Sequence, residues 1–137
     1  MEWMLMPLRR YADFSGRSRR KEYWMFLLFI VLVYSALGVV IAIVGFSGAE
    51  DGSSFGGVGG AMFIVLLLFG LAIFIPSIAV AVRRFHDQDK SGWFYLLNFI
   101  PYLGPIIVLV FMCLEGTKGP NRFGEDPKGG GSEEIFA

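Results

Sequence analysis

Charged residues are missing from three long stretches of this 137-residue chain, which cover residues 23–49, 52–82 and 91–114. Each stretch is longer than the roughly 20 apolar residues with which a helix crosses the ~30 Å hydrocarbon core of a bilayer. A soluble domain of this size has too little interior to bury so much Leu, Ile, Val and Phe. The missing charge therefore excludes an ordinary soluble domain and predicts an all-α integral membrane protein.

Cysteine and histidine occur once each, as Cys113 and His86. A single cysteine excludes an intramolecular disulfide framework, and its position in an apolar run predicts a packing role. One histidine with scattered acids lacks the ligand spacing of a metal site, so we expect neither a metal nor another cofactor. The phosphate-binding pattern G-x-x-x-x-G-K-[ST] is also missing. These absences leave no cofactor-dependent chemistry to assign.

The formal net charge is zero, but the cations are unevenly distributed. Residues 1–22 contain six of the twelve, the segment 83–90 contains three, and the acidic, Gly-rich segment 46–60 contains none. Cations that flank membrane spans stay on the cytoplasmic side. We therefore predict that the N-terminus and the 83–90 loop are cytoplasmic and that the 46–60 loop is outside.

These observations predict a single membrane domain over residues 1–127, followed by a disordered tail over 128–137. The predicted spans cover about 23–44, 61–82 and 93–114. Uninterrupted apolar character supports the first two spans as transmembrane helices, whereas the third contains several helix-breaking residues.

A short helix is predicted before the first span, lying in the headgroup region of the bilayer. Met4, Leu8 and Tyr11 fall at helical spacing beside Trp3, which is the pattern of an interfacial helix. Pro7 is expected to open this helix, because a missing N–H is harmless at the first helical position.

The second span contains one proline, Pro76, and the third contains Asn98, Pro101, Gly104 and Pro105. We expect a kink at Pro76. Two prolines and a glycine within five residues oppose a continuous third helix. A kinked third span would place the C-terminus outside, whereas a helical hairpin turning at residues 101–105 would return it to the cytoplasm. Both alternatives remain open, and the tail cations favour the hairpin.

Three polar segments flank the spans: FSGRSRRKEYW at 14–24, RRFHDQDKSGW at 83–93 and EGTKGPNRFGEDP at 115–127. In this order they resemble the patterns F-x-G-R-x-R-R-x-E-[YF]-W, R-R-x-H-D-x-x-x-S-G-W and G-T-x-G-x-N-[RK]-[YF]-G-x-D-P. These are typical of the family called domain of unknown function 805 (DUF805). The resemblance implies a small multi-pass protein of the bacterial inner membrane, and it brings no established activity with it.

The candidate site residues are the polar side chains of these segments that could act together. They are Arg17, Arg19, Arg20, Glu22, Arg83, Arg84, His86, Asp87, Ser91, Asn121, Arg122 and Asp126. The arginines could bind phosphates of anionic phospholipids, or they could pair with acids of the other segments and hold the segments together. His86 beside Asp87 could transfer protons, although no nucleophile is spaced convincingly beside them.

The sequence favours a non-enzymatic interaction, lipid-contacting or assembly protein. Its expected partners are the lipid bilayer, including anionic phospholipid headgroups, and a second copy of the chain or another membrane protein. Nucleic acid is not expected, because the basic run adjoins the membrane and the net charge is zero. The alternative is a subunit of an oligomeric transporter or channel, which the broken third span supports and the lack of charge inside the spans opposes. A membrane enzyme that uses His86 and Asp87 is the third hypothesis.

Overall fold

The computed structural model describes residues 2–47 and 57–128, and the elements within these ranges are helices apart from one isolated β-bridge. In chain order they are α1 (Glu2–Arg9), α2 (Arg20–Ser47), α3 (Val58–Asp87), the 3-10 helix η1 (Gly92–Phe99) and α4 (Leu103–Cys113). The all-α prediction is therefore confirmed. The acidic part of the predicted 46–60 loop and the predicted tail beyond residue 128 lie outside the described residues.

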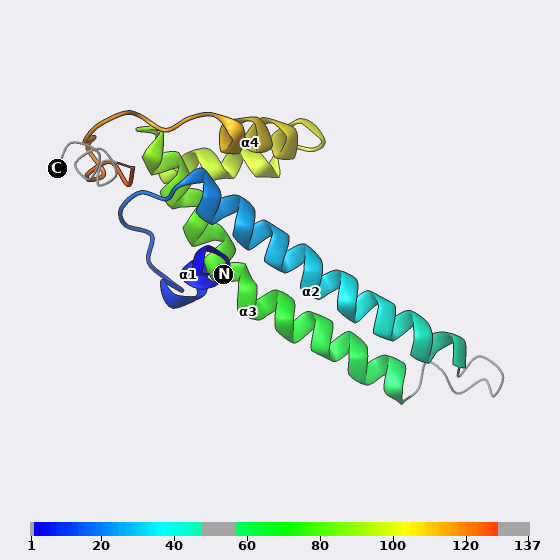
Figure 1. The fold of residues 1–137 in the computed structure, drawn as a ribbon. Helices are drawn as coiled ribbons and strands as arrows, with labels where there is room; N and C mark the ends of the chain where they lie inside the picture. Colours follow the sequence, from blue (N-terminus) through cyan, green and yellow to red (C-terminus); the bar gives the residue numbers. More distant parts are fainter. Residues whose placement is uncertain (1, 48–56, 129–137) are drawn as a thin grey trace.

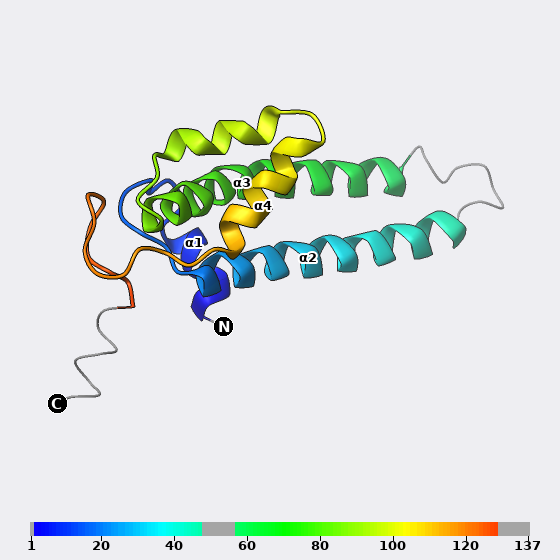
Figure 2. The same cartoon turned by 90° about the horizontal axis from the view of Figure 1, so that it is seen from above.

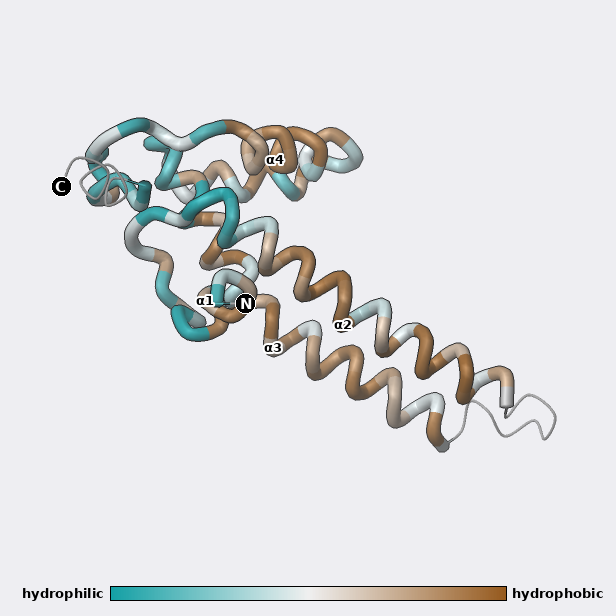
Figure 3. The backbone as a smooth tube through the Cα atoms, viewed as in Figure 1, coloured by the Kyte–Doolittle hydropathy of each residue, from teal (hydrophilic) through white to brown (hydrophobic). Residues whose placement is uncertain are grey.

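The helices α2 and α3 run side by side, and the shorter elements gather at one end of this pair (Figure 1). Both are long and apolar enough to cross a membrane. The most apolar 18-residue window of α2 contains no buried residue. Hydrophobic residues continue along both helices (Figure 3), and many of their side chains are exposed, as a lipid-embedded helix requires.

The helix α3 continues beyond the predicted end of the second span. The prediction of a loop over 83–90 is wrong for its first half, because Arg83, Arg84 and Asp87 lie in the last turns of α3. The sequence there contains no glycine or proline to end a helix. The reversal comes at Asp89, whose backbone has φ of 56°. The predicted second span, residues 61–82, contains no charged residue, and the charged residues of α3 all lie beyond its predicted end.

The helix α1 begins at Glu2 and packs on α2 and α3. Pro7 lies inside this helix and is buried, so the expectation that it opens the helix is wrong. Trp3 faces the beginning of α2, where the Arg19 guanidinium lies 5.4 Å from its ring centroid and the Lys21 ammonium 5.6 Å. These cation–π contacts hold the helix against the polar end of α2.

The proline of α3 explains a contact with the segment after α1. Because Pro76 has no backbone N–H, the carbonyl of Ala72, four residues earlier, loses its helical donor. The Tyr11 hydroxyl donates to this carbonyl at 2.5 Å. One side chain thus replaces the missing hydrogen bond and fastens the N-terminal segment to α3.

The third apolar run forms two short helices, η1 and α4, which fold back on each other (Figures 1 and 2). Between them the Leu103 N–H donates to the Pro101 carbonyl at 2.8 Å. Tyr102, at the centre of this γ-turn, has φ of 62° and ψ of −51°. This is the rare, strained form of the γ-turn. Residues 92–113 therefore have the geometry of the hairpin alternative.

The hairpin turn is shorter than the expected 101–105. Gly104 and Pro105 belong to the first turn of α4, where a proline does not need its N–H. Gly104 lies so close to η1 that a Cβ there would be 2.0 Å from the carbonyl oxygen of Leu97. A glycine is needed because η1 and α4 approach each other at this point.

A small apolar core lies between the polar end of α3 and the hairpin. Its buried members are Ala81, Phe85, Val108 and Met112. Cys113 follows this core but is exposed, so the expectation of a packing role is wrong. It lies at the last position of α4, where the helix passes into the polar C-terminal segment.

Candidate functional site

The three polar segments of the sequence meet at one end of the molecule (Figure 3). The first precedes and begins α2, the second ends α3, and the third follows α4. We call residues 115–128 the tail segment. Side chains from all three form ion pairs, which we together call the ion-pair cluster: the buried residues Arg17, Glu22, Arg83, Arg84 and Asp87, and the partly exposed Asp126.

Asp87 is the centre of this cluster. Its Oδ1 accepts a hydrogen bond from Arg17 Nε at 3.0 Å, and its Oδ2 accepts one from Arg84 Nη1. The side chains of Arg17, Arg84 and Asp87 are 1%, 0% and 4% exposed. Removing such charges from water is costly unless each is paired, so their pairing is a condition of the fold.

The backbone of Asp87 also binds the tail segment. Its carbonyl oxygen accepts hydrogen bonds from the Thr117 N–H at 2.7 Å and from the Thr117 hydroxyl at 3.0 Å. The preceding residue, Gly116, lies so close that a Cβ would be 2.0 Å from Asp87 Oδ2. Only glycine allows the tail segment to approach the carboxylate this closely.

Arg17 reaches from the first polar segment into the tail segment. Its Nη1 donates to the Gly119 carbonyl at 2.6 Å, and its Nη2 donates to the Thr117 carbonyl at 2.5 Å. The Asp126 carboxylate lies 4.0 Å from Arg17 Nη2. Hydrogen bonds from the backbone N–H groups of Lys128 and Gly119 hold the pKa of Asp126 below its ordinary value. One arginine therefore joins all three polar segments.

Glu22 and Arg83 form a second buried pair between α2 and α3. Arg83 Nη2 lies 3.2 Å from Glu22 Oε1, with side chains 0% and 3% exposed. Ser18 supports the pair, because its hydroxyl donates to Glu22 Oε2 at 2.6 Å and its N–H donates to the Arg83 carbonyl at 3.1 Å. Within the described residues neither Nη atom of Arg83 makes a hydrogen bond. Glu22 thus stabilises this cation mainly through charge.

The two arginines at the end of α3 do not reach the surface. Arg83 and Arg84 are both 0% exposed, so their guanidinium groups have no access to lipid phosphates in this structure. Their burial corresponds to the ion-pair alternative of the sequence analysis. The cluster contains three cations and three carboxylates, so its charges balance.

His86 and Asp87 are adjacent in sequence but face different partners. His86 Nδ1 lies 3.1 Å from the Gly16 carbonyl oxygen, and because a carbonyl only accepts, Nδ1 carries the proton of this bond. The imidazole stacks on the Phe123 ring, with centroids 4.0 Å apart and planes 4° apart. His86 therefore joins the first polar segment to the tail segment and forms no dyad with Asp87 in the described part of the chain.

The remaining candidate residues surround the cluster, apart from Ser91. Arg19 donates to the Pro127 carbonyl, Arg20 pairs with Glu115 at 2.9 Å, Asn121 donates to the His86 carbonyl at 2.9 Å, and Arg122 pairs with Asp89 at 3.2 Å. Ser91 instead caps η1, where its hydroxyl accepts from the Trp93 N–H at 3.4 Å. Within residues 2–47 and 57–128 no group of three or more His, Cys, Asp or Glu could hold a metal ion.

Sequence reasoning missed several residues that complete the site. Ser18 and Thr117 supply hydroxyl groups, Gln88 donates to the Phe111 carbonyl, and Gly116 gives the room that Asp87 needs. The four-residue spacing of Ser18 and Glu22 was no helix-face signal, because Ser18 lies two residues before α2 begins. The other contacts connect segments far apart in sequence, and no local pattern indicates them.

A known protein family matches the part of the chain that contains the three polar segments. The DUF805 family, described as proteins of unknown function, matches residues 11–125. This chain belongs to the DUF805 family. The resemblance inferred from the three polar segments is confirmed, and the match contains every residue of the ion-pair cluster except Asp126.

Three relatives of this DUF805 chain come from Escherichia coli strain K12. Inner membrane protein YhaI is 43% identical over 130 residues, covering 95% of this chain and 98% of YhaI. Inner membrane protein YhaH is 44% identical over 128 residues, covering 93% of this chain and 98% of YhaH. The uncharacterized protein YiiR is 26% identical over 139 residues, with 83% and 85% covered. No solved structure matches the chain.

Proposed function

We propose that this DUF805 chain is a multi-pass protein of the bacterial inner membrane that acts by contact and assembly rather than by catalysis. The observation that carries this proposal is the ion-pair cluster. Its charged groups bind one another and backbone carbonyls of the tail segment, so they have a structural use that needs no substrate.

The proposed topology places α2 and α3 across the membrane and the cluster in the cytoplasm. The uneven cation distribution supports this orientation. The relatives YhaI and YhaH, both named inner membrane proteins, support the location. In this topology the hairpin of η1 and α4 enters and leaves on the cytoplasmic side. Tyr102 at its turn is 91% exposed, so the irregular backbone there needs cover from headgroups, water or another protein.

The lipid-contacting part of the proposal uses surfaces outside the cluster. Apolar side chains are exposed along α2 and α3, including Leu32, Ile43, Leu68 and Leu71. In the membrane these faces contact lipid or the helices of another membrane protein, including a second copy. Lipid headgroups contact partly exposed cations such as Arg20, whose side chain is 39% exposed.

The ion-pair cluster can be separated from a lipid-phosphate site with one double variant. We expect Arg83→Gln with Arg84→Gln to reduce the amount of folded protein in the membrane while leaving the phospholipid carried per folded molecule unchanged. Quantitative lipid analysis of the purified chain, normalised to monodisperse protein, measures both. Loss of bound anionic phospholipid from protein of normal abundance would contradict the structural use of these arginines.

The enzyme hypothesis is tested at His86. Because its imidazole donates to a backbone carbonyl and stacks on Phe123, we expect His86→Asn to retain whatever cellular property is lost when the gene is deleted. Complementation of a deletion strain, with protein abundance measured by immunoblot, gives the result. An abundant but inactive His86→Asn protein would favour proton transfer instead.

A further inference from the structure

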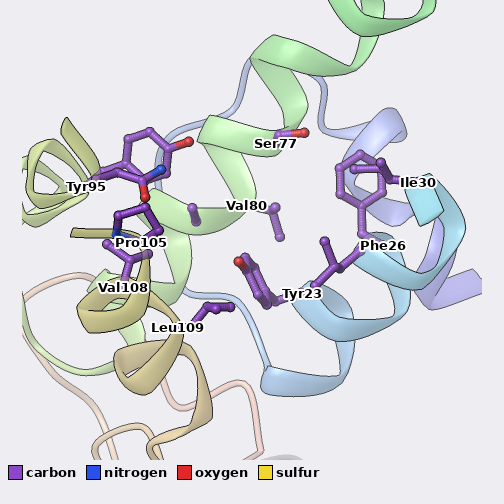
Figure 4. A pocket seen from close by; sticks show the side chains of 12 residues that line it. Tyr23, Phe26, Ile30, Ser77, Val80, Tyr95, Pro105, Val108 and Leu109 are labelled. Atoms are coloured by element: carbon purple, nitrogen blue, oxygen red, sulfur yellow. The ribbon is translucent and has the colours of Figure 1, made fainter. Parts of the chain in front are cut away.

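A cavity of about 290 Å³ lies between α2, α3 and the hairpin of η1 and α4 (Figure 4). Phe26 and Ile30 of α2 form one wall, Val80 of α3 lies behind, and Pro105 and Leu109 of α4 close the opposite side. These walls are apolar. The cavity is separate from the ion-pair cluster, because none of the cluster residues lines it.

Four polar side chains also line this cavity: Tyr23 from α2, Ser77 from α3, and Tyr95 and Asn98 from η1. The Ser77 hydroxyl donates to the Ile73 carbonyl at 2.6 Å. The two tyrosine hydroxyls and the amide make no hydrogen bond to other described residues, and none of their polar atoms is fully buried. Groups of this kind at membrane depth need a partner, because the hydrocarbon layer offers none. Apolar walls with a few converging polar groups are the usual composition of a ligand site.

The position of the cavity along α2 corresponds to the ester region of a lipid leaflet. Tyr23 begins the first charge-free stretch, and Ile30 lies about 10 Å further along the helix axis at 1.5 Å per residue. Arg20 precedes Tyr23 by three residues, so the two share a face of α2. Its guanidinium bridges to α4, donating to the Cys113 carbonyl at 3.0 Å and to Glu115 at 2.9 Å. Arg20 does not itself line the cavity, but it is a partly exposed cation one helical turn from Tyr23, which does.

We propose that this cavity binds one glycerophospholipid. Its phosphate lies at Arg20, its ester carbonyls accept hydrogen bonds from Tyr23, Tyr95 and Asn98, and the first methylenes of one acyl chain lie along α2. At roughly 30 Å³ for a group the size of water, the cavity holds about ten such groups. That is enough for the ester region and the beginning of a chain, while the rest of the lipid lies on the exposed apolar faces. The inference rests on the proposed placement of Tyr23 at the cytoplasmic interface.

Native mass spectrometry of the full chain, purified in mild detergent and incubated with phosphatidylglycerol, tests this site. The wild-type protein is expected to retain one phospholipid. The double variant Tyr95→Phe and Asn98→Leu removes two hydrogen-bond donors, so its affinity for the lipid should fall by roughly tenfold or more. Leu109→Trp, which fills the cavity from a partly exposed position, should lower retention as well.

Matched controls separate the site from general lipid contact. Tyr34→Phe makes the same kind of change further along α2, and Leu71→Trp adds the same bulk on an exposed face of α3. Both should retain the lipid as the wild type does. No retained lipid on the wild type, or equal retention by cavity and control variants of normal folding, would overturn the inference. Topology reporters that place the Tyr23 end of α2 in the periplasm would contradict the proposed function. Lipid-retention results that contradict the cavity site would leave that topology standing, so the two failures are distinguishable.

Discussion

Replacing Asp87 by asparagine removes one charge and almost no volume from the centre of the ion-pair cluster. Arg17 and Arg84 would remain 1% and 0% exposed, with one carboxylate fewer to balance them. Removing one partner of a buried ion pair costs about 3–5 kcal/mol, because the other charge stays buried without compensation. We expect Asp87→Asn to lower the free energy of unfolding by about this amount.

Asp89→Asn is the matched control, because it makes the same change two residues further along. Asp89 lies 3.2 Å from Arg122, but these side chains are 46% and 61% exposed. Exposed pairs contribute about 0–1 kcal/mol, so this variant should remain close to the wild type. Unfolding of the purified chain by SDS in mixed micelles, followed by tryptophan fluorescence, gives both free energies. If the two variants differ by less than about 0.5 kcal/mol, the buried pairs do not hold the fold together.

Three further changes test separate contacts. Tyr11→Phe should lower the free energy of unfolding by about 1 kcal/mol, because it removes the hydrogen bond to the Ala72 carbonyl. The loss should be smaller in a Pro76→Ala background, which restores the missing helical N–H. Equal losses in both backgrounds would contradict the contact. Gly104→Ala should lower the free energy of unfolding by about 1–3 kcal/mol, because the added Cβ would meet the backbone of Leu97 in η1. Gly38→Ala, which has open space around it, should not be destabilising. Equal stabilities of the two variants would mean that the hairpin is not tightly closed. The Asp126 carboxylate has a lowered pKa, so its stabilisation is complete above its ordinary value of 3.8 and is lost as the pH falls through the folded pKa. Tail-segment amide resonances should follow that titration in the wild type and not in Asp126→Asn.

The sequence predicted the parts of the fold that local patterns determine. Charge-free length indicated the two long helices, and two prolines with a glycine indicated a break between η1 and α4. The end of α3 was placed too early because Arg83 and Asp87 look like loop residues when only polarity is considered. They remain helical because buried partners in the first polar segment and α2 compensate their charges.

The candidate site was predictable as a set of residues but not as a geometry. Whether Arg84 binds lipid or a carboxylate depends on its burial, which follows from how α3 and the tail segment pack. The partners of Tyr11 and Gly116 are also distant in sequence, and neither contact leaves a periodic signal. Tertiary contacts, rather than local propensity, decide these details.

The side of the membrane that holds the C-terminus is the most direct test of the whole arrangement. Arg17, which precedes α2, donates hydrogen bonds both to the Asp87 carboxylate at the end of α3 and to the Gly119 carbonyl in the tail segment. All three must therefore lie on one side, which we propose from the cation distribution to be the cytoplasm. Paired reporters fused after residue 137, one active only in the cytoplasm and one only in the periplasm, should show a cytoplasmic C-terminus. A periplasmic C-terminus would make the third apolar run a membrane span, separate the tail segment from Arg17 and contradict the ion-pair cluster.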